Sequence, residues 1–317
     1  MAGVNTINIK SEKTGMNYRE PLKVKRSREE LFFGILAYIY LAFASMFCLI
    51  PFLLVIGGSF SSESSIKRYG FRIIPKEFSL EAYSLIFRSP RQLLNAYGIT
   101  IFITTVGTFS AIFLISMTAY VLHRKDFKYR NKFALYFYFT NLFNGGLVPW
   151  YILMVRYLKM KNNLFALIIP LLFSVFYMII IRTFMSSIPD SISESAKIDG
   201  AGDFTIFIKL ILPLSKPALA TIGLFVALNY WNDWFNAMLF IEKRNLIPLQ
   251  YYLHQILSTI EGLRRILQDL PNDAVVELPG ESFKMAMTVV TIGPIILLYP
   301  YLQKYFIKGI MLGAVKG

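Results

Sequence analysis

Six apolar runs dominate this sequence, and each is long enough to cross the hydrocarbon core of a bilayer as a helix. They are residues 31–56, 96–122, 133–154, 164–184, 218–241 and 285–307. Hydrophobic residues make up 55% of the 317 and charged residues 16%, with a mean hydropathy of +0.51, which excludes a soluble domain of this size. Because a bilayer offers no water to backbone polar groups, the sequence predicts an all-α, polytopic membrane protein with six transmembrane helices.

The segments between the runs define the expected organisation of the chain. Residues 1–30 form a basic tail, residues 31–308 the six-span domain, and residues 309–317 a short C-terminal tail. Inside the domain, residues 189–217 form a polar loop and residues 242–283 a long insertion. Six spans place both termini on one side of the membrane.

Basic residues in the tail and in the loop HRKDFKYRNK indicate which side this is. Short cytoplasmic loops carry an excess of Lys and Arg, whereas long loops such as the one containing Lys67, Arg68 and Arg72 count less. We therefore expect a multi-pass protein of the plasma membrane, with both termini and the 189–217 loop in the cytoplasm.

The polar loop is predicted to fold as a helix, a turn and a second helix. Ser191 and Glu194 have the spacing of a capping box, which predicts a helix start. Gly200 predicts a left-handed helix stop, and Asp203 is expected to cap the second helix. A compact plug of this kind suits a groove on another protein.

The same loop resembles the EAA coupling loop of bacterial ABC-importer permeases. The matching positions are Glu194, Ser195, Ala196, Gly200, Leu210, Leu212 and Pro213. Ser195 stands where alanine is usual and Leu210 where isoleucine is usual. The stretches KIDGAGDF and LPLSKPALAT resemble the MalG-like permeases of carbohydrate importers. The stretches NGGLVPWYIL and LPLSKPALATIGLF resemble permeases for complex or uronic-acid-containing oligosaccharides.

This resemblance implies one transmembrane permease subunit of an ATP-driven, binding-protein-dependent importer. The implied partners are a second related permease, two copies of a P-loop ATPase, an extracellular solute-binding protein and an oligosaccharide substrate. The residues implied to couple to the ATPase are Glu194, Ser195, Ala196, Asp199, Gly200, Phe204, Phe207, Leu212 and Pro213. The C-terminal residues implied to enter the ATPase interface are Gly313, Val315, Lys316 and Gly317.

For Phe204 and Phe207 two interpretations stay open at this point. They are either anchors in an ATPase groove or packing residues beneath the spans of this chain.

No motif for catalysis or cofactor binding occurs in the chain. It lacks GxxxxGK[ST], so ATP and Mg are expected on the partner ATPase. His123 and His254 are far apart, and Cys48 stands alone in an apolar run, which leaves no expected metal site. The formal charge of +14 is concentrated in short loops between apolar runs, so membrane lipid rather than nucleic acid is the expected partner of these charges.

Polar and aromatic residues inside the runs are candidates for the substrate path. They are Asn141 and Asn144 in the third run, with Asn229, Trp231, Asn232, Asp233, Trp234 and Asn236 in the fifth. Amides and aromatic faces in an apolar wall are typical of a small-ligand site. Anchoring of the two tryptophans at the membrane interface is the alternative.

Other functions remain possible from the sequence alone. An importer of a non-sugar solute would carry the same loop. An ion-coupled secondary transporter needs ionisable residues in mid-membrane, and the runs hold few, such as Arg182 and Asp233 near their ends. Apolar residues at helical spacing between Leu249 and Leu270 predict an amphipathic helix in the insertion. That helix packs against the permease or reaches the binding protein.

Overall fold

The computed structural model describes residues 28–88, 90–268 and 280–296. In these ranges the regular elements are helices, apart from an isolated β-bridge between Ser61 and Phe78. The chain divides into two units, residues 1–52 and residues 53–317. The first unit holds most of α1 (Arg28–Ser59), which is apolar, long enough to cross a membrane and exposed along most of its length. The first expected span is therefore confirmed.

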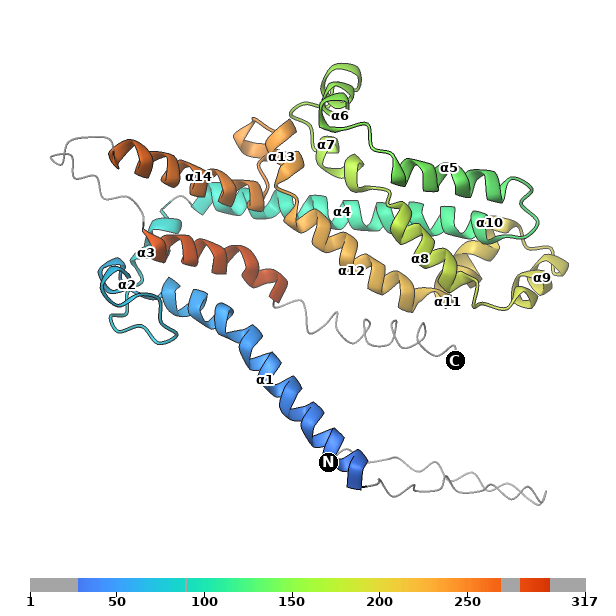
Figure 1. Ribbon diagram of the computed structural model, residues 1–317. Helices are drawn as coiled ribbons and strands as arrows, with labels where there is room; N and C mark the ends of the chain where they lie inside the picture. Colours follow the sequence, from blue (N-terminus) through green and yellow to red (C-terminus); the bar gives the residue numbers. More distant parts are fainter. Residues whose placement is uncertain (1–27, 89, 269–279, 297–317) are drawn as a thin grey trace. The chain divides into compact units, whose positions relative to one another are not determined.

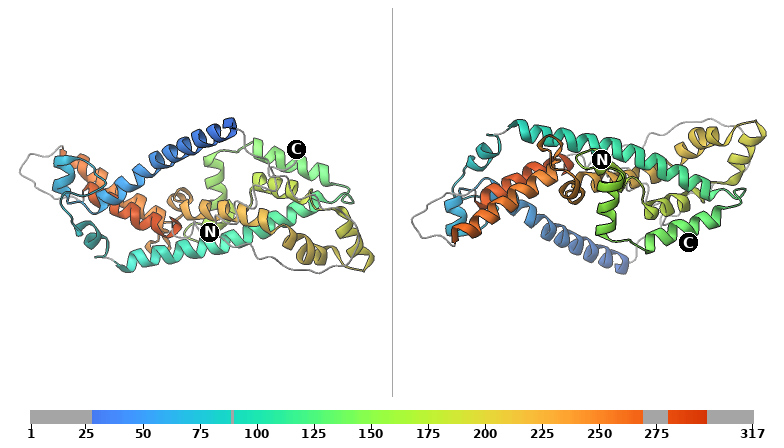
Figure 2. Two further views of the ribbon diagram at one scale, coloured as in Figure 1. Left: turned by 90° about the horizontal axis from the view of Figure 1, so that it is seen from below. Right: turned by 90° about the horizontal axis from the view of Figure 1, so that it is seen from above.

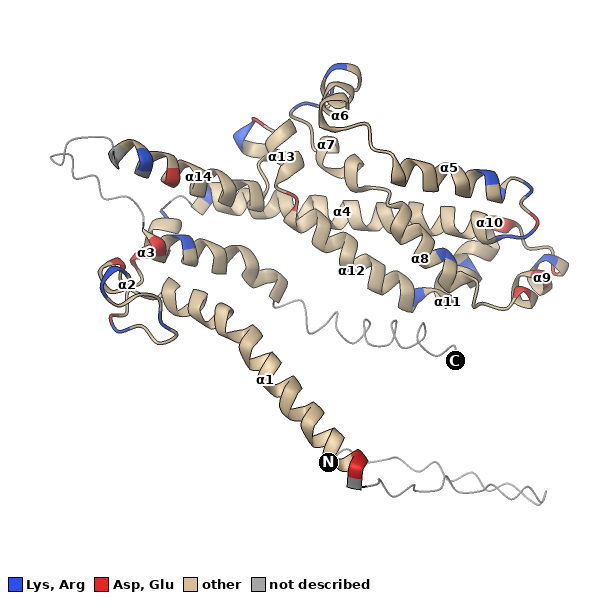
Figure 3. Cartoon of the chain, in the orientation of Figure 1, with Lys and Arg blue, Asp and Glu red and all other residues tan. Residues whose placement is uncertain are grey.

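Three helices pack together in the centre of the second unit. They are α4 (Pro90–His123), α8 (Val175–Met185) and α12 (Lys216–Asn232), which lie side by side in Figure 1 and Figure 2. Small and apolar residues fill their interface, including Ala111, Ala119 and Met178. Figure 3 shows that charged residues gather at helix ends and in loops, leaving uncharged stretches between them. This is the distribution that a bilayer requires.

A close approach in this packing is made at Gly107 on α4. A Cβ atom at Gly107 would collide with the ring of Tyr230 on α12. The Tyr230 hydroxyl in turn donates a hydrogen bond of 2.8 Å to the carbonyl oxygen of Ile168. Small residues at such crossings let helix backbones approach and gain van der Waals contact.

Several expected spans are broken rather than continuous. Within the described residues, α1 and α4 are the helices that are long and apolar enough to cross a membrane unbroken. A bent pair, residues 165–171 with Val175–Met185, turns by 50° and matches the fourth expected run. Residues 203–214 and Lys216–Asn232 turn by 82° at Ser215.

The third expected run is divided into three pieces. They are α5 (Arg130–Leu142), α6 (Leu147–Ile152) and the π-helical turn η1 (Leu153–Tyr157). Between α5 and α6, the Asn144 side chain accepts a hydrogen bond of 2.8 Å from the backbone of Gly146, whose φ is +88°. The polar break predicted there is confirmed.

The fifth run was expected to be one span and is two helices. α12 ends at Asn232, and α13 (Phe235–Phe240) begins after Trp234. The Asp233 carboxylate accepts hydrogen bonds from the Asn236 backbone (3.1 Å) and side-chain amide (2.9 Å). It satisfies a free N–H group in the first turn of α13, and so makes a new helix start inside the run.

The N-terminal half of α4 lies against a second apolar cluster. This cluster joins α3 (Glu81–Ile86), α14 (Leu249–Gln268) and the helix of residues 281–296, through buried Leu93, Leu249 and Ala286. α2 (Glu63–Tyr69) is tied to the same region, since the Glu63 carboxylate accepts two hydrogen bonds of 3.2 Å from Ser282.

The short elements α7 (Phe165–Ile168), η2 (Ile169–Leu171) and η4 (Arg244–Leu246) complete this part. The amphipathic helix predicted in the insertion is confirmed by α14, whose apolar residues between Leu249 and Ile260 pack against the permease itself.

We expect Gly107→Ala to destabilise the protein by about 1–3 kcal/mol, because the added methyl group displaces the rigid Tyr230 ring. The measurement is thermal unfolding of the purified chain in detergent. Gly98→Ala is the matched control on the same helix, since nothing lies within 4 Å of its added Cβ. Equal effects of the two variants would contradict the close approach.

Candidate functional site

The polar loop after α8 folds as predicted, into a helix, a turn and a second helix. α9 spans Asp190–Ile198, and after the turn come α10 (Asp203–Ile206), the π-helical η3 (Phe207–Ile211) and α11 (Leu212–Leu214). Gly200 has φ of +81°, and the amide of Ala201 bonds back to the carbonyl oxygen of Ala196 at 2.9 Å. Gly200 is therefore the left-handed helix stop that the sequence predicted.

Both predicted helix caps are wrong. α9 starts at Asp190, before Ser191, and Pro189 at its N-cap makes no side-chain hydrogen bond. α10 has Gly202 at its N-cap, with Asp203 already inside the helix. At α10 the Asp203 carboxylate is instead paired with Arg124 at 2.6 Å, and at α9 the extended backbone of Pro189 places the helix start before Ser191.

An ion-pair cluster fastens the loop to the end of α4. Arg124 bonds Asp126 (2.5 Å) and Asp203 (2.6 Å), while Lys197 on α9 bonds Asp126 at 2.7 Å. Hydrogen bonds from Arg124 and then Lys197 hold the pKa of the Asp126 carboxyl well below its usual range. Lys125 likewise lowers the pKa of the Asp190 carboxyl. Four side chains from three segments thus fix the turn between α9 and α10.

The two phenylalanines of the loop have different environments. Phe207 is 1% exposed and stacks on Tyr120 of α4, with ring centroids 5.4 Å apart. Phe204 is 63% exposed, and Ile198 at the end of α9 is 87% exposed. The packing interpretation is confirmed for Phe207, whose side chain is unavailable as an anchor in a partner's groove. Phe204 keeps the geometry of an anchor.

The other predicted coupling residues divide in the same way between surface and core. Exposed residues are Glu194, Ser195, Asp199, Gly200 and Pro213. Ala196 and Leu212 are partly buried against the core of the second unit. In the part of the chain that the structure describes, no hydrogen bond or ion pair engages the Glu194 carboxylate. The predicted contacts of Gly313, Val315, Lys316 and Gly317 lie outside the described residues.

Two of the predicted substrate-path residues meet in one cavity. It has a volume of about 490 Å³ and lies between α5, η2, α8 and α12. Asn141 and Asn229 line it together with Ser174 and Tyr177, and the Asn229 amide donates to the Tyr177 hydroxyl at 3.1 Å. Its other lining residues are apolar, apart from Thr140. A few amides and hydroxyls in an apolar wall form the usual binding site for a polar small molecule.

The remaining substrate-path candidates lie elsewhere and make structural contacts. Trp231 is 6% exposed in the cluster that also holds Leu93. The side-chain oxygen of Asn232 accepts a hydrogen bond of 3.2 Å from Gln250. Trp234 stacks on His254, with centroids 4.4 Å apart. Asn144 makes the hydrogen bond to Gly146 between α5 and α6, and Asp233 and Asn236 make the hydrogen bonds at the start of α13. None of the six lines the cavity.

Sequence reasoning missed Tyr177 in the cavity, and Arg124, Asp126 and Lys197 at the loop. Tyr177 lies in an apolar run and carries no sequence signal. The basic loop was used only to assign the side of the membrane, although Asp126 among its cations marked a possible acceptor for loop cations. Among the described residues, no three His, Cys, Asp or Glu side chains gather as metal ligands.

Comparison with known proteins gives these features a context. Residues 88–311 match the family model described as "Binding-protein-dependent transport system inner membrane component". The chain is 39% identical over 285 residues to the polygalacturonan/rhamnogalacturonan transport system permease YtcP of Bacillus subtilis, covering 90% of this chain and 98% of that protein. It is 27% identical to the trehalose/maltose permease MalG of Thermococcus litoralis, covering 92% and 99%.

A solved structure has the same fold. A chain in the crystal structure of a bacterial ABC transporter involved in import of the acidic polysaccharide alginate matches with a TM-score of 0.74 and 31% identity, covering 89% of this chain and 99% of that one. The match includes the all-helical architecture and most of the chain length. This chain is an integral membrane protein of the binding-protein-dependent transport system inner membrane component family, the permeases of ABC importers.

Proposed function

We propose that this chain couples ATP hydrolysis on two partner ATPase subunits to uptake of an acidic oligosaccharide. The observation that carries the proposal is the loop of residues 189–217, which is folded and presents the exposed side chains of Glu194 and Phe204. A second permease completes the translocation path, and an extracellular binding protein delivers the substrate. ATP and Mg belong to the ATPase, since this chain has no P-loop.

The loop has two physical connections to the membrane helices. The ion pairs of Arg124 and Lys197 join it to the end of α4, and Phe207 packs against Tyr120 of the same helix. Through the 82° bend at Ser215 it continues into α12. Closure of the ATPases on binding ATP moves the loop, and α4 and α12 move with it to open the path outward. Hydrolysis resets the path inward. The loop and both termini face the cytoplasm in this arrangement.

The cavity with Asn141 and Asn229 supplies contacts for a sugar acid. A carboxylate accepts hydrogen bonds, which an asparagine amide and the hydroxyls of Ser174 and Tyr177 can donate. Two similar proteins support an acidic substrate class. YtcP is named for transport of polygalacturonan and rhamnogalacturonan, which contain uronic acids, and the solved importer is involved in the import of the acidic polysaccharide alginate. The companion permease provides the opposite wall of the path.

Glu194→Ala tests the coupling role. We expect ATP-dependent uptake to fall by about tenfold or more, the loss that follows from removing one hydrogen bond to a charged group. The free energy of unfolding should stay the same, since no described residue of this chain bonds the carboxylate. The measurements are uptake into proteoliposomes and recovery of the ATPase with the tagged chain.

Glu81→Ala is the control for that experiment. Glu81 is an exposed carboxylate on α3, which packs near the opposite end of α4 from the loop. The Glu81→Ala variant should leave recovery of the ATPase with the tagged chain unchanged. Normal uptake by the Glu194 variant would disprove the coupling role. Recovery of the wild-type chain without any ATPase would contradict the proposed partnership.

Asp126→Asn tests the ion-pair cluster. We expect a double-mutant cycle with Lys197→Gln to give a coupling energy of about 0.2–1 kcal/mol, because these side chains are largely solvent-exposed. The folded state depresses the pKa of Asp126, so its contribution is present above about pH 4 and is lost as pH falls further. A contribution that first disappears between pH 6 and 8 would rule out this carboxylate as the source.

Asn229→Ala tests the substrate cavity. Removing the amide should raise the KM for uptake by about fivefold to tenfold, since one hydrogen bond is lost. Asn95→Ala is the matched control, because Asn95 bonds the carbonyl oxygen of Asn245 at 2.9 Å and does not line the cavity. If both KM and kcat are unchanged in an Asn141→Ala/Asn229→Ala variant, the cavity is not on the substrate path.

A further inference from the structure

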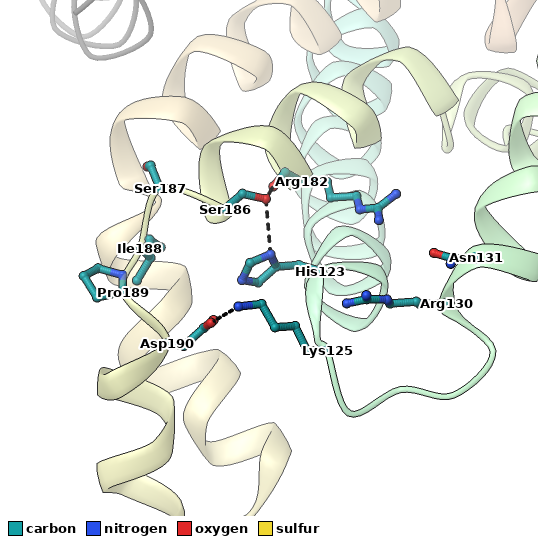
Figure 4. A pocket seen from close by; sticks show the side chains of 10 residues that line it. All are labelled: His123, Lys125, Arg130, Asn131, Arg182, Ser186, Ser187, Ile188, Pro189 and Asp190. Carbon is teal, nitrogen blue, oxygen red and sulfur yellow. Dashed lines mark hydrogen bonds and ion pairs between the residues drawn. The ribbon is translucent and has the colours of Figure 1, made fainter. Parts of the chain in front are cut away.

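A second cavity, of about 420 Å³, lies beside the base of the loop. It is bounded by the end of α4, the start of α5, the end of α8 and the start of α9. Figure 4 shows four basic side chains around it, His123, Lys125, Arg130 and Arg182. Asp190 is the one acidic residue in its lining. The cavity is therefore unlike the neutral cavity of Asn141 and Asn229.

The positive charge of this cavity is not balanced by the described part of the chain. Lys125 is neutralised by Asp190, with its Nζ atom 2.6 Å from a carboxylate oxygen. Across the described ranges, no carboxylate lies within 4.0 Å of Arg130 or Arg182. Both arginine residues are partly buried and line the same cavity. The positive charges of Arg130 and Arg182 repel each other in this cavity, and an anion bound between them removes this electrostatic cost.

The hydrogen-bonding groups around the cavity fit a phosphate group. A guanidinium donates two parallel hydrogen bonds, and such forks match the oxygens of phosphate. Asn131 adds an exposed side-chain amide. Ser186 lies against His123, with its hydroxyl oxygen 3.3 Å from Nδ1, and donates to the carbonyl oxygen of Arg182 at 3.0 Å. The arginine and amide donors come from two segments, the start of α5 and the end of α8, so one phosphate would bridge them.

The position of the cavity favours a lipid as the source of the phosphate. α4 ends at His123 and α8 at Met185, and both belong to segments apolar enough to cross a membrane. The cavity lies just beyond these ends, at the depth where apolar helix surface gives way to charged residues. Phospholipid headgroups occupy this depth, and basic pockets there bind anionic lipids.

We propose that the cavity of Arg130 and Arg182 binds a phosphate group, carried by the headgroup of an anionic phospholipid. The bound phosphate joins the start of α5 to the end of α8, next to the first residue of α9. It also offers Lys125 an alternative to Asp190. The lipid thereby stabilises the base on which the loop stands. This proposal is independent of the substrate and of the ATPase.

Native mass spectrometry of the full chain in a neutral detergent tests the proposal. We expect phosphatidylglycerol to bind more tightly than phosphatidylcholine of the same acyl chains. Arg130→Gln/Arg182→Gln should weaken phosphatidylglycerol binding by more than about tenfold, since each arginine supplies charge-assisted hydrogen bonds. Lys128→Gln is the matched control: it removes an exposed charge from the same loop, outside the cavity lining, and should have little effect.

Two further variants keep the test decisive if the double variant does not fold. Arg182→Lys retains the positive charge but loses the paired hydrogen-bond donors of the guanidinium group. This variant should bind phosphatidylglycerol less tightly than the wild type and more tightly than the double variant. Arg130→Gln alone should weaken it by less than the double variant. Elution volume and thermal unfolding temperature establish that each variant is folded.

The outcomes separate the sources of phosphate and the alternatives. If millimolar inorganic phosphate displaces phosphatidylglycerol from the wild type, the phosphate site is supported and a soluble carrier is also possible. Unchanged phosphatidylglycerol binding in the double variant overturns the proposal, as does equal binding of the two lipids by the wild type. Loss of a co-purified protein with unchanged lipid binding assigns the two arginines to a protein contact instead, which also overturns it.

Discussion

The contact between α4 and α12 is the constraint on which the second unit depends. In a bilayer the lipid tails are as apolar as the side chains, so helices associate through close packing and hydrogen bonds. Gly107 allows the ring of Tyr230 to lie directly against the α4 backbone. The Tyr230 hydroxyl then donates a hydrogen bond to the carbonyl oxygen of Ile168, inside the segment of residues 165–171. One aromatic side chain thus positions three segments.

Because α4 is continuous over 34 residues, it connects distant parts of the second unit. Near its first residues it packs with α14 and the helix of residues 281–296, and near its last residues it holds the loop of residues 189–217. Between these ends it lines the core with α8 and α12. Movement at the loop has a rigid path to the rest of the unit through this helix.

Much of this fold was predictable, because apolar length and the glycine signal are local properties. The run that became α1 and the helix stop at Gly200 needed only their own residues. The helix cap at Asp203 failed because its carboxylate pairs with Arg124, about 80 positions away, and the cap at Ser191 failed because the helix already begins after Pro189. The break at Asp233 was missed because a membrane run was treated as uniform, although the carboxylate and Asn236 had the spacing for a new helix start. The site was only partly predictable. Helical periodicity places Phe204 and Phe207 in the same apolar pattern, and only the folded structure shows that Phe204 is exposed and Phe207 is buried.

The burial of Phe207 has a consequence for assembly. The loop of residues 189–217 is held by its own chain, through an aromatic stack, a left-handed turn at Gly200 and the ion pairs of Lys197. A partner that docks on it therefore loses little affinity to conformational entropy, because no segment has to fold on contact. Such preorganised surfaces associate nearly as rigid bodies. A small contact area is then enough for a complex that must also withstand repeated mechanical cycles.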